Sequence, residues 1–62
     1  MGEKIKKRRE ELGISQAELA EMTGISRVQI SNYERGACKG ATWQNLRKLA
    51  AALKVKPNYF FD

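Results

Sequence analysis

Apolar residues recur along this chain at helical intervals in several stretches, with polar residues on the intervening faces. This spacing is typical of helices that bury one side, whereas half-buried strands would show strict alternation. It predicts an all-α fold with helices over about 2–12, 16–23, 27–35 and 43–54, and a short fifth helix beginning at Pro57, a residue suited to a first helical turn. The repeating apolar positions are Ile5 and Leu12, then Ala17, Leu19, Ala20 and Met22, then Ile30 and Tyr33, and finally Trp43, Leu46, Leu49, Ala50 and Leu53.

Polar residues at the expected helix ends predict where each helix begins and stops. Ser15 and Glu18 have the spacing of a capping box, in which each side chain accepts from the other residue's backbone amide. Gly24 ends that helix, since glycine adopts the left-handed conformation without a Cβ penalty. Ser26 and Thr42 are expected to cap the next two helices. The middle of the chain therefore holds two short capped helices joined by a glycine turn.

The helix expected over 27–35 presents an outward face of mixed polar and apolar groups. Its inward side carries Ile30, Tyr33 and Glu34. On the outward side, arginine can bond guanine, asparagine can bond adenine and valine can touch a thymine methyl group, so this face suits contact with base edges. A plain solvated face with a single exposed valine is the alternative. The outward residues are Arg27, Val28, Ser31, Asn32 and Arg35.

Spaced motifs over nearly the whole chain resemble the helix-turn-helix family of phage repressors and Cro, also called xenobiotic-response-element type regulators. The motifs are Gln16-Ala17-Glu18-Leu19-Ala20, Gly24-Ile25-Ser26 and Ile30-Ser31-Asn32-Tyr33-Glu34-Arg35-Gly36, with Arg9, Leu12 and Gly13 matching the first helix and Leu46, Leu49, Ala52, Leu53 and Val55 the fourth. The resemblance implies one compact lambda-repressor-like domain of five helices over residues 1–62. It also implies sequence-specific binding to a double-stranded DNA operator by a homodimeric transcriptional regulator, more often a repressor.

In that family the helix matching 27–35 is the recognition helix, which lies in the major groove. The resemblance and the outward face together imply base contacts by Arg27, Val28, Ser31 and Asn32. The family's glutamine at the start of the preceding helix contacts a phosphate, and the loop and next helix start touch the DNA backbone. The implied phosphate contacts are Gln16, Arg35, Lys39, Thr42 and Gln44. The loop after Gly36 is longer here than in the shorter phage examples, so contacts in 37–44 transfer less directly.

The basic run Lys6-Lys7-Arg8-Arg9 is interpreted mainly as a solvated helix face, because nearby glutamates reduce the net positive electrostatic field of the run. Arg9 is the exception. The resemblance implies an ion pair between Arg9 and Glu34 that ties the first helix to the end of the recognition helix. The residues of the first helix expected to face outward are Lys4, Lys7, Arg8 and Glu11.

Lysine and arginine number 12 against 7 aspartate and glutamate, which leaves a net charge of +5. This balance favours a polyanionic partner such as nucleic acid. A cationic helix lying on a membrane surface is the competing use of the charge. The apolar stretches are far shorter than the ~20 residues of a membrane span, and the first residues lack the apolar core of a signal peptide. The sequence therefore predicts a cytoplasmic protein without a membrane partner.

The single cysteine and the lack of histidine limit the chemistry of the chain. Cys38 can form neither an internal disulfide nor a cysteine-based zinc site. Without histidine, the usual metal ligand and the usual acid-base catalyst near neutral pH are missing. We therefore expect no catalytic residues, no metal, no cofactor and no small-molecule ligand. Cys38 is interpreted as an incidental loop thiol.

The aromatic residues of the C-terminal part are assigned mainly to the core. Trp43 is expected to be buried, in preference to lying against a sugar-phosphate backbone. Tyr59, Phe60 and Phe61 are expected to return to the core, and any ring left outside would serve a dimer contact. A protein-interaction module of the same fold, as in antitoxins, is the alternative function. It would depend on these C-terminal rings and not on the outward face of the recognition helix.

Overall fold

The computed structural model of the chain describes residues 2–37 and 42–61. Within this part the all-α prediction is confirmed, with four α-helices followed by a 3-10 helix. The short fifth helix predicted from Pro57 is a 3-10 helix and not an α-helix, so the count of five helices is slightly off; the backbone bond from Tyr59 N to Lys56 O joins residues three apart. The elements are α1 (Gly2–Glu11), α2 (Gln16–Thr23), α3 (Arg27–Glu34), α4 (Trp43–Leu53) and η1 (Pro57–Phe61).

The predicted helix caps are confirmed. Ser15 Oγ accepts from the amide of Glu18 at 3.0 Å, and Glu18 Oε1 accepts from the amide of Ser15 at 2.9 Å. Gly24 has φ 75°, a left-handed conformation that turns the chain between α2 and α3. The hydroxyls of Ser26 and Thr42 each accept from the amide three residues further on, at 3.1 Å. These caps satisfy amides that a helix start leaves without intrahelical partners.

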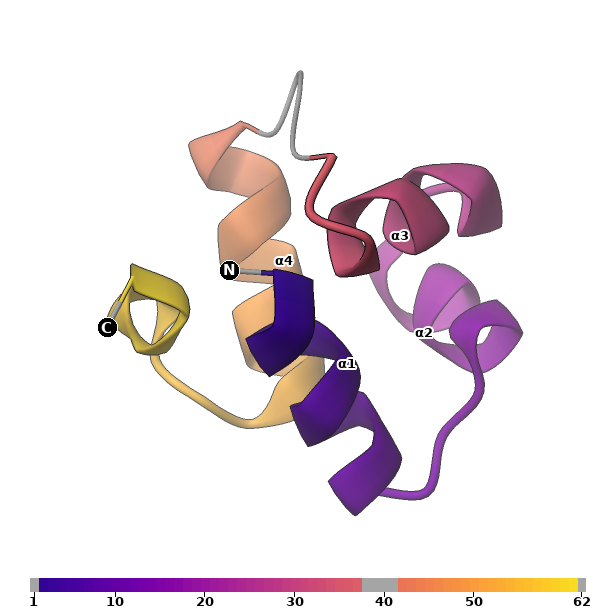
Figure 1. Cartoon of the computed structure of the whole chain (residues 1–62), viewed down its shortest axis with the longest axis horizontal. Coiled ribbons are helices and arrows are strands. Elements are labelled where there is room, and N and C mark those ends of the chain that lie inside the picture. The colour runs from indigo at the N-terminus through magenta and orange to yellow at the C-terminus, as the bar shows by residue number, and fades with distance from the viewer. Residues whose placement is uncertain (1, 38–41, 62) are drawn as a thin grey trace.

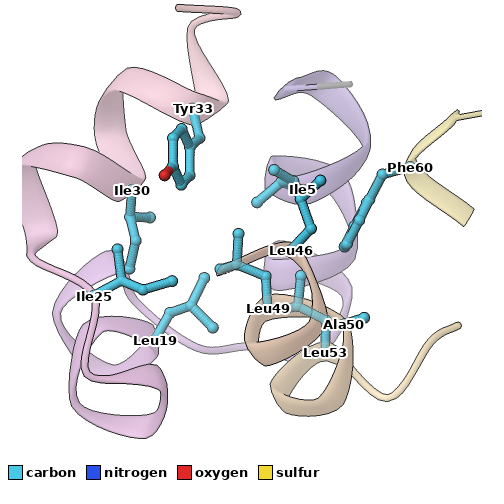
Figure 2. Packing of buried hydrophobic residues seen from close by; sticks show 10 residues of the cluster. All are labelled: Ile5, Leu19, Ile25, Ile30, Tyr33, Leu46, Leu49, Ala50, Leu53 and Phe60. Carbon is cyan, nitrogen blue, oxygen red and sulfur yellow. The ribbon is translucent and has the colours of Figure 1, made fainter. Parts of the chain in front are cut away.

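The core draws side chains from every described element (Figure 2). Figure 1 shows α2 and α3 together on one flank of α4, with α1 in front of α4. Helices as short as α2 and α3 are marginal alone, so burial of their apolar sides decides whether they form. Each fully buried aliphatic or aromatic side chain contributes roughly 1.5–3 kcal/mol. The buried residues are Ile5, Leu19, Ile25, Ile30, Tyr33, Leu46, Leu49, Ala50, Leu53 and Phe60.

The expected burial of Trp43 is wrong, because its side chain is 56% exposed. Trp43 is the first residue of α4, and in Figure 1 this turn stands clear of the ribbons of α1 and η1. The apolar stripe of α4 thus continues beyond the helices that cover it, and burial begins at Leu46. The spacing of apolar residues predicts which face of a helix is buried. It does not tell where the neighbouring helices that cover this face end.

Two basic residues of α1 that were expected to face outward are instead half-buried and bonded to backbone carbonyls. Arg8 Nε donates to Leu53 O at 2.9 Å, and Lys4 Nζ donates to Tyr59 O at 3.2 Å while lying 5.4 Å from the Tyr59 ring centroid. Leu53 is the last residue of α4, where carbonyls lack intrahelical donors. These cations therefore hold α1 against the end of α4 and against η1.

The ion pair implied between Arg9 and Glu34 is present and joins α1 to the end of α3. Arg9 Nε donates to Glu34 Oε2 at 2.6 Å and Nη2 donates to Oε1 at 3.1 Å, a bidentate geometry. Arg9 Nη1 also donates to Ile14 O at 2.9 Å. The two charged side chains are only 11% and 5% exposed. One guanidinium thus fixes α1, the turn before α2 and the end of α3 relative to one another.

The same contact sets the protonation of Arg9. The hydrogen bond to the Glu34 carboxylate raises the pKa of Arg9 above its ordinary value, burial opposes this rise, and the attraction of the Glu34 charge adds to it. A raised pKa in the folded state means that the stabilisation is complete below the unfolded pKa and is lost only as the pH rises through the folded one. Arg9 therefore keeps its charge at neutral pH.

Gly2 lies where the start of α1 meets the end of α3. It is buried, and a Cβ placed on it would lie 2.2 Å from Tyr33 O and 2.8 Å from Glu34 O. Both atoms belong to the backbone at the end of α3, whose inward side chains are held in the core. Only a residue without a side chain fits this approach.

We expect Gly2→Ala to lower the free energy of unfolding by about 1–3 kcal/mol, because the added methyl group must displace backbone and not a flexible side chain. Thermal unfolding followed by circular dichroism measures this, at about 4–8 °C per kcal/mol for a domain of this size. Lys6→Ala, at an exposed position of the same helix, is the control and should leave the midpoint nearly unchanged. Equal midpoints for Gly2→Ala and Lys6→Ala would contradict the close approach.

Arg9→Ala is expected to cost about 3–5 kcal/mol, because Glu34 would keep a buried charge without its partner. Urea unfolding of the purified chain measures the loss, with the exposed Lys7→Ala as a control for removal of a cation. Adding Glu34→Gln to Arg9→Ala removes the unpaired charge and should recover part of the stability. The account fails if Arg9→Ala unfolds at the wild-type urea concentration, or if the double variant is less stable than the single one.

Candidate nucleic-acid interface

A shallow hollow of about 270 Å³ lies between the start of α2 and the outward face of α3. It combines guanidinium groups, amides, a hydroxyl and one valine. The four residues predicted to touch bases all line it, together with two of the five predicted to touch phosphates. The lining residues are Gln16, Arg27, Val28, Ser31, Asn32 and Arg35.

The inward residues of α3 determine which of its side chains reach the hollow. Ile30 and Tyr33 are almost fully buried, and Glu34 is 9% exposed. Because successive helix residues are spaced by about 100°, the side of α3 opposite these three residues faces away from the core. Val28 lies on that side, and it is 71% exposed although it is apolar. The fold thus holds one apolar group in solvent among polar ones.

Glu34 also controls the residue that borders the hollow from α2. Gln16 Nε2 donates to Glu34 Oε1 at 3.1 Å, so one carboxylate accepts from Gln16 and from Arg9. A carboxylate has only acceptors, so the amide nitrogen of Gln16 and not its oxygen must face Glu34. The second hydrogen of that nitrogen remains for another acceptor. Gln16 is therefore oriented by α3 before any ligand arrives.

The hydroxyl of Tyr33 joins α3 to the start of α4 through two residues that the sequence analysis did not single out. Gln29 Nε2 donates to Tyr33 Oη at 2.9 Å, and Asn45 Nδ2 donates to the same oxygen at 3.1 Å. Tyr33 is only 1% exposed, so these two hydrogen bonds satisfy a buried hydroxyl. The spacing of four between Gln29 and Tyr33 on one helix is a signal that could have identified the first contact. No local spacing in the sequence could have identified the contact of Asn45, because Asn45 lies on α4 and Tyr33 on α3.

The remaining predicted phosphate contacts lie apart from the hollow or outside the described residues. Thr42 is exposed and caps α4. Gln44 lies on the outer face of α4 beside Arg47, Lys48 and Ala51, a separate surface. Lys39 falls outside the described residues, as do Cys38 and the side chain of Phe61.

The described part of the chain, 2–37 and 42–61, offers little for other kinds of site. It contains no group of three or more histidine, cysteine, aspartate or glutamate residues placed to hold a metal ion. None of its helices combines the length and the apolar character that crossing a membrane demands.

Comparison with known proteins gives several relatives along nearly the full chain. The chain is 44% identical over 59 residues to Repressor protein C2 of Salmonella phage P22, covering 95% of this chain and 27% of that protein. It is 36% identical over 62 residues to the HTH-type transcriptional regulator SinR of Bacillus subtilis, covering 100% of this chain and 56% of SinR. The chain therefore spans 27% of the length of Repressor protein C2 and 56% of the length of SinR.

The structural comparison matches the same phage protein. The crystal structure of the P22 c2 repressor protein in complex with a synthetic operator has a TM-score of 0.87 to this structure at 43% identity, covering 94% of this chain and 86% of that one. The family model described as helix-turn-helix matches residues 5–60, from α1 to η1. The chain therefore belongs to the helix-turn-helix family.

Proposed function

We propose that this chain binds double-stranded DNA in a sequence-specific manner and regulates transcription, as a repressor, with α3 in the major groove. The observation that carries the proposal is the hollow between α2 and α3, where the residues predicted to read bases converge. B-DNA has a major groove wide enough for one helix, and the outward face of α3 carries the exposed Arg27, Val28 and Arg35. The similar P22 c2 repressor protein was solved in complex with a synthetic operator, which supports binding to operator DNA.

The base-reading group is Arg27, Val28, Ser31 and Asn32. Arg27 and Asn32 supply hydrogen-bond donors, Ser31 supplies a hydroxyl, and the exposed Val28 supplies an apolar contact for a thymine methyl group. Each bidentate contact discriminates against a wrong base by roughly 1–3 kcal/mol. These four residues lie within positions 27–32 of α3, so we expect them to read a short run of bases in each half-site.

Contacts to the DNA backbone would position this reading face. Gln16 borders the hollow with its amide nitrogen already oriented by Glu34, and Thr42 and Gln44 lie at the start of α4. Helix starts present free amides and favour phosphate. The net charge of +5 supplies the sequence-independent attraction to DNA. The proposed backbone contacts are Gln16, Arg35, Lys39, Thr42 and Gln44.

A two-fold dimer would place two copies of α3 about 34 Å apart, on successive turns of one face of a palindromic operator. Val55 and Tyr59 are half-buried and border an open apolar surface that a second copy can cover. This role needs no catalytic residues, cofactor or small-molecule ligand. It places the chain in the compartment that holds the DNA, which in a bacterial cell is the cytoplasm.

Substitutions in the two groups should have different effects on sequence preference. Arg27→Ala is expected to weaken the best site by about 1–3 kcal/mol and to relax the preference at one base pair, because a base contact is lost. Gln16→Ala should weaken all sequences by a similar factor, because a backbone contact carries no sequence information. Selection from a random duplex library, followed by titration of single-base variants, measures both effects.

Lys7→Ala serves as the matched control, since it removes an exposed cation on α1 away from the hollow. It should change neither the preferred sequence nor, beyond a small charge effect, the affinity. If Arg27→Ala and Gln16→Ala give the same sequence profile, the division into base and backbone contacts is wrong. If the wild-type chain enriches no sequence at all, the protein-interaction alternative is favoured instead.

Salt should weaken binding steeply. With about five phosphate contacts per monomer, the slope of log affinity against log salt is expected near −4 to −5 per half-site, because each neutralised phosphate releases counterions. Fluorescence anisotropy of a labelled duplex between low and moderate salt measures the slope. A slope close to zero would contradict an interface built on the DNA backbone.

A further inference from the structure

The first turn of α4 lies at the edge of the core, although the DNA backbone contacts proposed at Thr42 and Gln44 depend on its position. Thr42, Trp43 and Gln44 are exposed, and the buried stripe of α4 starts only at Leu46. α4 packs against α1, α2 and η1, whereas α3 packs against α1 and α2. Because the ends of helices fray readily, the position of this turn relative to α3 depends on contacts made by the turn itself.

Asn45 makes such a contact, because its side chain reaches the last turn of α3. Its Nδ2 donates to Tyr33 Oη at 3.1 Å, while its backbone amide donates to Thr42 Oγ1 at 3.1 Å. Tyr33 is 1% exposed and belongs to the core cluster, so its hydroxyl is held in place by the packing around it. Asn45 thus joins the start of α4 both to its own cap and to α3.

The same hydroxyl is also bonded within α3. Gln29 Nε2 donates to Tyr33 Oη at 2.9 Å, and Gln29 is next in sequence to Val28 of the base-reading group. One buried oxygen therefore accepts from the helix proposed to read bases and from the helix start proposed to contact the DNA backbone. Base edges and phosphates are separated by set distances in a duplex, so two groups of contacts held in register lose less freedom upon binding.

We propose that Tyr33 is a positioning residue for DNA binding, whose hydroxyl holds the start of α4 in register with α3. This role rests on the proposed function, and it belongs to a residue too deeply buried to touch DNA itself. Without the hydroxyl, the ring would still fill the core and α3 would still present its base-reading face. The fixed position of the backbone contacts on α4 would be lost.

Tyr33→Phe tests the bond directly, because it removes the hydroxyl and keeps the ring. Affinity for every duplex should fall by about 3- to 10-fold, as expected for one lost hydrogen bond, while the preferred sequence stays the same. The slope of log affinity against log salt should become less steep by about 1 to 2, because the phosphate contacts at Thr42 and Gln44 are weakened. Fluorescence anisotropy of a selected duplex and its single-base variants, over a series of salt concentrations, measures all three quantities.

Asn45→Ala removes the other end of the bond and keeps the backbone amide that Thr42 caps. It should reproduce the effects of Tyr33→Phe, and the double variant should bind no more weakly than either single variant, because both changes delete one interaction. Gln29→Ala is the matched control. It removes the second donor to the same oxygen but keeps the bond to Asn45, and it should retain the wild-type salt slope.

A second control separates positioning from a general loss of stability. Ile5→Val shortens a fully buried side chain on α1, so it should lower the thermal unfolding midpoint. At a temperature where circular dichroism shows every variant folded, Ile5→Val should keep the wild-type affinity and salt slope.

Several outcomes separate this proposal from the function on which it rests. Wild-type affinity and salt slope in Tyr33→Phe would overturn the positioning role, and so would additive losses in the double variant or an equal loss of slope in Ile5→Val. Each of these results leaves sequence-specific binding intact. A wild-type chain that selects no sequence would overturn the proposed function itself.

Discussion

The buried carboxylate of Glu34 is the contact on which the arrangement of this chain depends. It accepts two bonds from Arg9 of α1 and one from Gln16 of α2, while belonging itself to the last residue of α3. Short helices have little stability alone, so their relative positions must come from such tertiary contacts and from the core. The same carboxylate therefore satisfies a structural cation and orients an amide at the surface.

The surface that results is made of groups fixed before a ligand binds. Gln16 is oriented by Glu34, and beneath the surface the buried hydroxyl of Tyr33 is bonded to Gln29 and Asn45. Ordering long side chains upon association costs about 0.5–1.5 kcal/mol each, so orientation in the free state reduces that cost.

Much of this fold and site could be predicted from local signals in the sequence. The capping box of Ser15 and Glu18 and the left-handed Gly24 act over a few residues, and they delimit α2 and α3 directly. Helical spacing then assigns Ile30 and Tyr33 inward and Val28 outward. Contacts between distant parts of the chain were not readable in this way. The bonds of Lys4 to η1 and of Arg8 to the end of α4, the burial of Gly2 and the exposure of Trp43 depend on where other elements lie and stop. No local pattern in the sequence gives these positions.

The most direct test of the account is an NMR titration of the labelled chain with a duplex recovered by selection, which reports every backbone amide at once. If α3 lies in the major groove, the largest shifts should fall on residues 27–35 and at Gln16, with smaller shifts at the start of α4. The outer residues of α1 should remain unchanged. Tight binding accompanied by shifts on α1 or η1, while the amides of α3 stay in place, would contradict the proposed interface.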